Sequence, residues 1–67
     1  MQTLTVNGEK RAHENGMTVA SLLAEIVNSA ATVVVEVNGL IIPRERFDAT
    51  PLNAGDTVEI VHFVGGG

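Results

Sequence analysis

The sequence has no cysteine, tryptophan or tyrosine, and it has few basic residues: four lysines and arginines against eight aspartates and glutamates, for a net charge of −4. Without cysteine the chain forms no disulfide, no cysteine-based zinc site and no side-chain persulfide. With so few basic residues the chain cannot form the basic stripe that binds nucleic-acid phosphates. An acidic surface is better suited to basic protein partners. No segment approaches the ~18 apolar residues of a membrane span, and the first residues have no basic region followed by an apolar run. We therefore expect a cytoplasmic protein that binds neither nucleic acid nor a membrane.

The length argues against an enzyme. A chain of 67 residues makes one domain, and a domain of this size buries only about 60% of its unfolded surface. Nearly every aliphatic side chain is then needed in the core, which leaves few for a catalytic cleft. His13 and His62 are the only histidines, and their spacing predicts neither a metal site nor a catalytic triad. We expect no catalytic activity, and no metal or cofactor bound by the chain itself.

Strands and turns account for most of the chain. Alternating and β-branched apolar residues predict strands at residues 3–6, 9–14, 32–37, 40–42 and 57–64. The Asn-Gly pairs at 7–8 and 38–39 supply the positive φ angles of tight hairpin turns. Pro43 ends the fourth strand, and residues 44–51 are expected to form an irregular or single-turn segment anchored by Phe47.

One helix is expected between the second and third strands. Thr18 is its predicted N-cap, and residues 28–31 are its predicted exit. Its apolar residues recur on one face, namely Val19, Leu22, Leu23, Ile26 and Val27. The strand residues expected to face this helix are Leu4, Val6, Val33, Val35, Val58 and Ile60.

The opposite face of the sheet is expected to be mostly polar, with the apolar exceptions Val34, Val61 and Phe63. Two of these residues lie close to the last residues of the sequence, where an exposed apolar patch would mark a docking surface. The alternative is that Leu40 or Ile42 folds over them and forms a minor core.

The last residues of the sequence are Val64, Gly65, Gly66 and Gly67. A frayed end or a cloning scar is one interpretation. The functional interpretation is that residues without a Cβ can thread a channel barely wider than a backbone, placing the terminal carboxylate about 10 Å beyond the folded body. That carboxylate is a poor electrophile until a partner holding ATP and Mg²⁺ adenylates it, after which a sulfur nucleophile can displace AMP. On a chain without cysteine, the Gly67 carboxyl is the predicted position for covalently carried sulfur.

Two segments carry a resemblance to a known family: Asn38-Gly-Leu-Ile-Ile-Pro-Arg, and the run Asn-Ala-Gly-Asp-Thr-Val-Glu-Ile-Val-His-Phe-Val-Gly-Gly-Gly at residues 53–67. Together with the length and element order, they resemble the ThiS-type sulfur carriers of thiamin biosynthesis, β-grasp proteins of the ubiquitin-like superfamily related to MoaD. The resemblance implies an α+β fold, with a mixed sheet of four or five strands packed on one helix over residues 1–64. Residues 65–67 would form a flexible glycine tail.

The resemblance also implies the chemistry and the partners. Gly67 would be adenylated by an E1-like enzyme (ThiF type) and converted to a thiocarboxylate, with Gly65 and Gly66 threading the active site. A sulfur donor such as a cysteine desulfurase would load it, and a thiazole synthase (ThiG type) would receive the sulfur. The residues expected to contact partners are Val34, Val61, Phe63 and Val64.

Other functions share this pattern. A MoaD-like carrier for molybdopterin synthesis and a ubiquitin-like modifier would use the same activation of the terminal glycine. In a noncovalent β-grasp interaction module the glycine tail would have no role.

Overall fold

The computed structural model describes residues 2–27 and 32–63 of the chain. Its elements are β1 (Thr3–Val6), β2 (Glu9–Ala12), α1 (Val19–Ile26), β3 (Val33–Val37), β4 (Leu40–Ile42), the 3-10 helix η2 (Arg44–Ala49) and β5 (Thr57–His62). This order confirms the predicted sequence of strands and helix. The predicted helix exit at 28–31, Val64 and the glycine tail lie outside the described residues.

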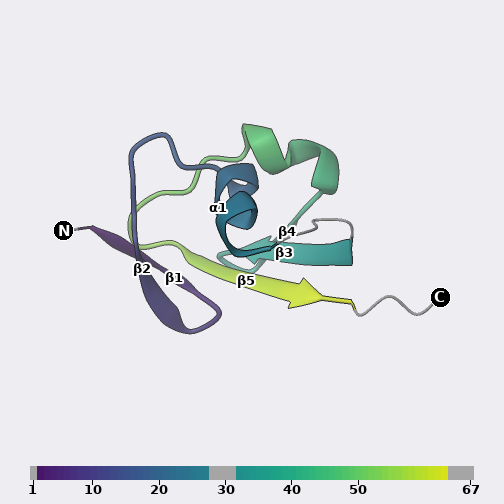
Figure 1. The fold of residues 1–67 in the computed structure, drawn as a ribbon, viewed down its shortest axis with the longest axis horizontal. Coiled ribbons are helices and arrows are strands. Elements are labelled where there is room, and N and C mark those ends of the chain that lie inside the picture. The colour runs from purple at the N-terminus through teal and green to yellow at the C-terminus, as the bar shows by residue number, and fades with distance from the viewer. Residues whose placement is uncertain (1, 28–31, 64–67) are drawn as a thin grey trace.

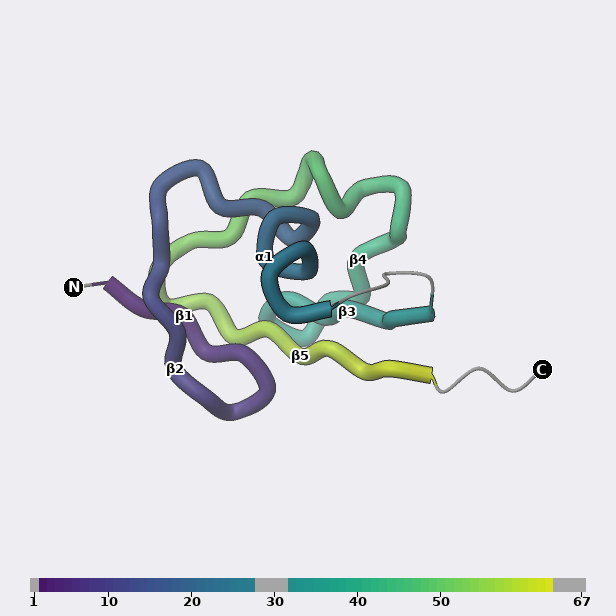
Figure 2. The backbone as a smooth tube through the Cα atoms, viewed as in Figure 1, coloured from purple at the N-terminus to yellow at the C-terminus, as the bar shows by residue number. Residues whose placement is uncertain are grey.

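One mixed sheet holds the five strands, in the order β2-β1-β5-β3-β4. β1 and β5 run parallel, and the other neighbouring strands run antiparallel. β5 therefore occupies the middle of the sheet and joins the β1–β2 hairpin to the β3–β4 hairpin. With α1 lying across one face (Figures 1 and 2), the α+β class and the β-grasp arrangement implied by the resemblance are confirmed.

The start of α1 is set by Thr18, as predicted. The Thr18 hydroxyl accepts a hydrogen bond from the Ser21 N–H at 3.1 Å, and the Ser21 hydroxyl accepts one from the Thr18 N–H at 2.9 Å. This reciprocal pair satisfies two backbone donors that the first helical turn would otherwise leave open. The cap thereby sets the residue at which the helix begins.

The core lies between α1 and the sheet. Its buried members include the six strand residues predicted to face the helix and the helical residues Val19, Leu22 and Leu23. The 3-10 helix η2 lies on the same side of the sheet (Figure 1), and its Phe47 is buried, which confirms the predicted anchor. The described core is therefore built on one face of the sheet only.

Three strand boundaries differ from the prediction. β3 begins at Val33 instead of residue 32. β2 ends at Ala12 instead of residue 14, although the His13 N–H still donates to the Gln2 carbonyl oxygen at 2.9 Å. The His13 ring bonds the Leu52 carbonyl oxygen at 2.7 Å. The last strand ends at His62, where Val33↔His62 is the final pair of the β3–β5 ladder. The one α-helix in the described part spans 8 residues, too few to cross a membrane.

Candidate docking surfaces beside the last strand

The face of the sheet turned away from α1 carries an exposed apolar patch. Val34 and Val61 lie directly opposite each other in the β3–β5 ladder, so their side chains share this face. Val61 is 50% exposed and Phe63 is 55% exposed, whereas Val34 is half-buried. We call these three residues together with Ile41 the open-face patch.

The alternative of a minor core is wrong, and the strand register gives the reason. Leu40 pairs with Val37 and Ile42 pairs with Val35. Directly opposed residues share a face, and Val35 and Val37 belong to the main core, so Leu40 and Ile42 lie on the helix side of the sheet. Ile41 instead lies on the open face opposite Glu36 and is 67% exposed. The sequence reasoning missed Ile41 because β4 was not assigned a register.

Two carboxylates adjoin the open-face patch. Glu36 pairs with Glu59 across β3 and β5. This pair lies two residues along the ladder from Val34↔Val61, so both pairs are on the open face. Like charges placed directly opposite each other disfavour the sheet by a few tenths of a kcal/mol or more. A partner surface that brings a basic side chain would offset this repulsion, in keeping with the net charge of −4.

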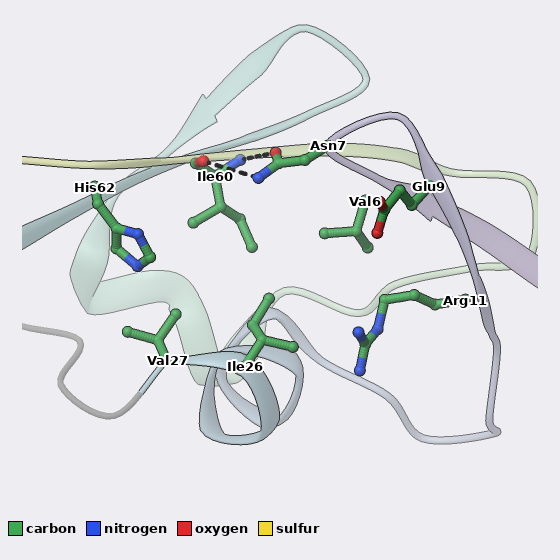
Figure 3. A pocket seen from close by; sticks show the side chains of 8 residues that line it. All are labelled: Val6, Asn7, Glu9, Arg11, Ile26, Val27, Ile60 and His62. Carbon is green, nitrogen blue, oxygen red and sulfur yellow. Dashed lines mark hydrogen bonds between the residues drawn. The ribbon is translucent and has the colours of Figure 1, made fainter.

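Asn7 has a role beyond its turn. Its φ of 50° is the left-handed conformation that the hairpin requires. Its side-chain oxygen accepts the Ile60 N–H at 2.8 Å, and its amide nitrogen donates to the Ile60 carbonyl oxygen at 3.2 Å (Figure 3). The amide thus takes the place of a backbone peptide beside β5, just past the point where β1 ends.

Asn38 does the same from the other hairpin. Its φ is 52°, its side-chain oxygen accepts the Thr57 N–H at 2.9 Å, and its amide nitrogen donates to Asp56 Oδ1 at 3.0 Å. Asp56 Oδ2 also accepts the Asn53 N–H at 2.7 Å, which stabilises the turn before β5. Both turn asparagines therefore hold β5, the strand that leads to residues 64–67.

A second surface, the helix-side groove, lies on the other side of β5 (Figure 3). Val6 and Ile60 enter it from the sheet, and Ile26 and Val27 enter it from the end of α1. Its volume is about 230 Å³, and its polar lining residues are Asn7, Glu9, Arg11 and His62. Arg11 pairs with Glu25 at 3.4 Å and so ties β2 to α1 beside the groove. Nothing in the sequence pattern pointed to this groove.

The remaining predicted site residues are the last four of the sequence. Val64, Gly65, Gly66 and Gly67 lie outside the described residues, and their roles stay predictions. The histidines do not meet: His13 bonds Leu52, whereas His62 lies at the end of β5. Across residues 2–27 and 32–63, no three histidine, aspartate or glutamate side chains gather as metal ligands would.

Known proteins resemble the chain over nearly its whole length. The sequence model of the ThiS family matches residues 2–67. The sulfur carrier protein ThiS of Bacillus subtilis is 46% identical over 50 residues, covering 75% of this chain and 76% of its own. The crystal structure of the thiamine biosynthesis protein ThiS from Geobacter metallireducens superposes with a TM-score of 0.80 at 43% identity, covering 97% of this chain and 99% of that one.

A longer protein also contains a similar segment. Thiazole synthase of Paramagnetospirillum magneticum is 42% identical over 64 residues, which cover 96% of this chain and 20% of the thiazole synthase. The chain thus spans about a fifth of the length of that relative.

Proposed function

Because the chain belongs to the ThiS family of small sulfur carrier proteins, we propose that it carries sulfur for thiazole formation in thiamin biosynthesis as a thiocarboxylate at Gly67. The single observation behind this proposal is the family match, which extends through the glycine tail to residue 67. The carrier acts in the cytoplasm as a protein co-substrate and catalyses no step itself.

The proposed chemistry has two steps. First, a Gly67 carboxylate oxygen attacks the α-phosphorus of ATP on a ThiF-type enzyme, which releases pyrophosphate and leaves an acyl adenylate. Second, the outer sulfur of a cysteine persulfide on a donor such as a cysteine desulfurase attacks the acyl carbon and AMP leaves; a further thiol then attacks the donor's cysteine sulfur in the resulting acyl disulfide, which releases the Gly67 thiocarboxylate and leaves a disulfide between that thiol and the donor. ATP and Mg²⁺ belong to the activating enzyme, and this chain contributes the carboxylate alone.

Gly65 and Gly66 serve as the threading segment. A residue without a Cβ fits a channel that admits only backbone, and it reaches φ angles closed to other residues. Ordering such a segment costs about 1–2 kcal/mol per residue in backbone entropy. The folded domain must therefore supply binding energy of its own.

The open-face patch supplies that energy in this proposal. Val34, Val61 and Phe63 lie on one face of the sheet, with Val64 next along the chain. Phe63 belongs to the aromatic residues that are enriched in interface cores, and the two valines extend the apolar surface beside it. Their position at the end of β5 places the docking surface directly before the residues that enter the partner.

A ThiG-type thiazole synthase is the proposed acceptor of the sulfur. The similar segment within the Paramagnetospirillum thiazole synthase supports this choice, because a carrier joined to the synthase would be kept close to it.

Mass spectrometry of the protein from its own host tests the proposal. We expect a chain that ends at Gly67, with a fraction in which one terminal oxygen is replaced by sulfur. A native chain that continues past Gly67 without being trimmed would refute the terminal thiocarboxylate. An isopeptide bond to a lysine would identify a modifier, and sulfur transfer to a molybdopterin precursor would identify a MoaD-like carrier.

A further inference from the structure

Among the described residues, no strand lies beside the second half of β5 on one of its edges. β1 pairs with β5 only at Thr5↔Thr57 and Val6↔Val58, and then turns away. The Asn38 N–H donates to the Thr57 carbonyl oxygen, and the Phe63 N–H donates to the Thr32 carbonyl oxygen. The odd-numbered residues of β5 therefore direct their backbone N–H and C=O toward β3, and the even-numbered residues direct theirs toward the β1 side. On the β1 side, the Asn7 side chain bonds both the N–H and the C=O of Ile60. His62 is the next residue of β5 whose N–H and C=O lie on that edge.

The backbone N–H and C=O of His62 have no partner in the part of the chain that the structure describes, so an added strand could bind them. Within the described residues, no acceptor is placed on the His62 N–H and no donor on its carbonyl oxygen. A free donor and acceptor on a sheet edge match the backbone of another extended chain. The helix-side groove opens along this same edge (Figure 3).

The groove has the shape and polarity that such a strand needs. Ile26, Val27 and Ile60 provide an apolar lining for every second side chain of an added strand. Arg11 is already paired with Glu25, whereas the exposed Glu9 carboxylate leans toward the groove without a described cationic partner (Figure 3). A basic side chain complements that carboxylate and the net charge of −4.

We propose that the β5 edge and the helix-side groove bind an extended segment of a partner protein as an additional strand, with apolar side chains in the groove and a lysine or arginine beside Glu9. This inference rests on the proposed function, because the segment belongs to one of the two enzymes that receive the carrier. It adds a second contact to the open-face patch: alternation places residues 61 and 63 on one face of β5 and residues 60 and 62 on the other. The partner thereby holds β5 from both faces.

Two matched pairs of variants test the strand. His62→Pro removes the edge N–H, while His62→Ala removes the imidazole and keeps the N–H. The proline is compatible with the fold because the His62 N–H does not bond β3. Glu9→Lys reverses the charge at the groove, and Glu14→Lys makes the same change at an exposed loop residue that does not line it. Thermal unfolding first establishes that each variant is folded.

The readout is the dissociation constant of the full chain with the host's ThiF-type enzyme and with its ThiG-type enzyme. We expect His62→Pro to bind at least one enzyme about five-fold or more weakly than His62→Ala, since only the proline removes the edge N–H, and Glu9→Lys to bind about five-fold or more weakly than Glu14→Lys, as the loss of one interfacial hydrogen bond or ion pair implies. Glu14→Lys itself should stay within about two-fold of the wild type. In the same complex, hydrogen exchange of the His62 amide should slow.

The outcomes separate the two proposals. Equal affinity of His62→Pro and His62→Ala for both enzymes, or an exposed His62 amide in both complexes, overturns the added strand while the carrier function stands. Failure of the wild-type chain to bind either enzyme overturns the proposed function, and the inference that rests on it falls as well.

Discussion

Substitutions at Asn7 can separate its two roles, which are to adopt the positive φ of the hairpin turn and to bond the Ile60 backbone. Asn7→Gly keeps a residue that adopts the observed φ of 50° easily but removes both hydrogen bonds to Ile60, which are 2.8 and 3.2 Å long. Each bond is worth about 1 kcal/mol, so the free energy of unfolding should fall by about 2 kcal/mol. Asn7→Ala loses the same bonds and, unlike glycine, keeps a Cβ in the left-handed region without the side-chain hydrogen bonds of asparagine, so it should be about 1 kcal/mol or more less stable than Asn7→Gly.

The matched control is Asn38→Gly. Asn38 has a similar φ of 52° and likewise makes two side-chain bonds, to Thr57 and Asp56, but these bonds are exposed whereas those of Asn7 are partly buried. Water replaces an exposed bond more readily, so we expect a loss of about 1 kcal/mol or less.

Urea unfolding followed by far-UV circular dichroism measures the effect, since the chain has no tryptophan or tyrosine to report by fluorescence. A loss of 2 kcal/mol corresponds to a fall in Tm of roughly 8–16 °C for a domain of this size. If Asn7→Gly were as stable as the wild type, or lost no more than Asn38→Gly, the claim that the amide substitutes for a missing strand peptide would be refuted.

Three further substitutions test other parts of the molecule. Phe63→Ser should weaken the complex with the ThiF-type enzyme by about 1–3 kcal/mol without changing the urea midpoint; an unchanged dissociation constant would remove Phe63 from the docking surface. Gly66→Leu should abolish adenylation in ATP–pyrophosphate exchange while the domain melts as the wild type does, and a normal exchange rate would contradict the threading argument. Thr18→Ala should lower the free energy of unfolding by about 1 kcal/mol through loss of the bond to the Ser21 N–H, and an unchanged midpoint would show that the cap contributes nothing.

Most of the fold could be predicted from local patterns in the sequence. Alternation assigned the buried face of each long strand, and the i, i+3, i+4 spacing assigned the buried face of the helix. Asn-Gly pairs marked both hairpin turns, because few other residues accept their φ angles. These features depend only on neighbours in the chain, so a single sequence carries them.

The features that were missed depend on contacts between distant residues. Asn7 and Ile60 are 53 positions apart, and no local pattern links them. Ile41 reaches the open face only because β4 pairs with β3 in one particular register. The helix-side groove exists because β1 ends before β5 does, and that depends on the length of a neighbouring strand in the sheet.

The central position of β5 has a consequence for how the protein is made. During translation the first hairpin, the helix and the second hairpin leave the ribosome before β5 does, yet neither hairpin can pair with the other until β5 enters between them. A polypeptide cut short before β5 is left with two separate hairpins, each only marginally stable in water, and would be open to proteolysis. Only chains synthesised through β5 can therefore complete the sheet.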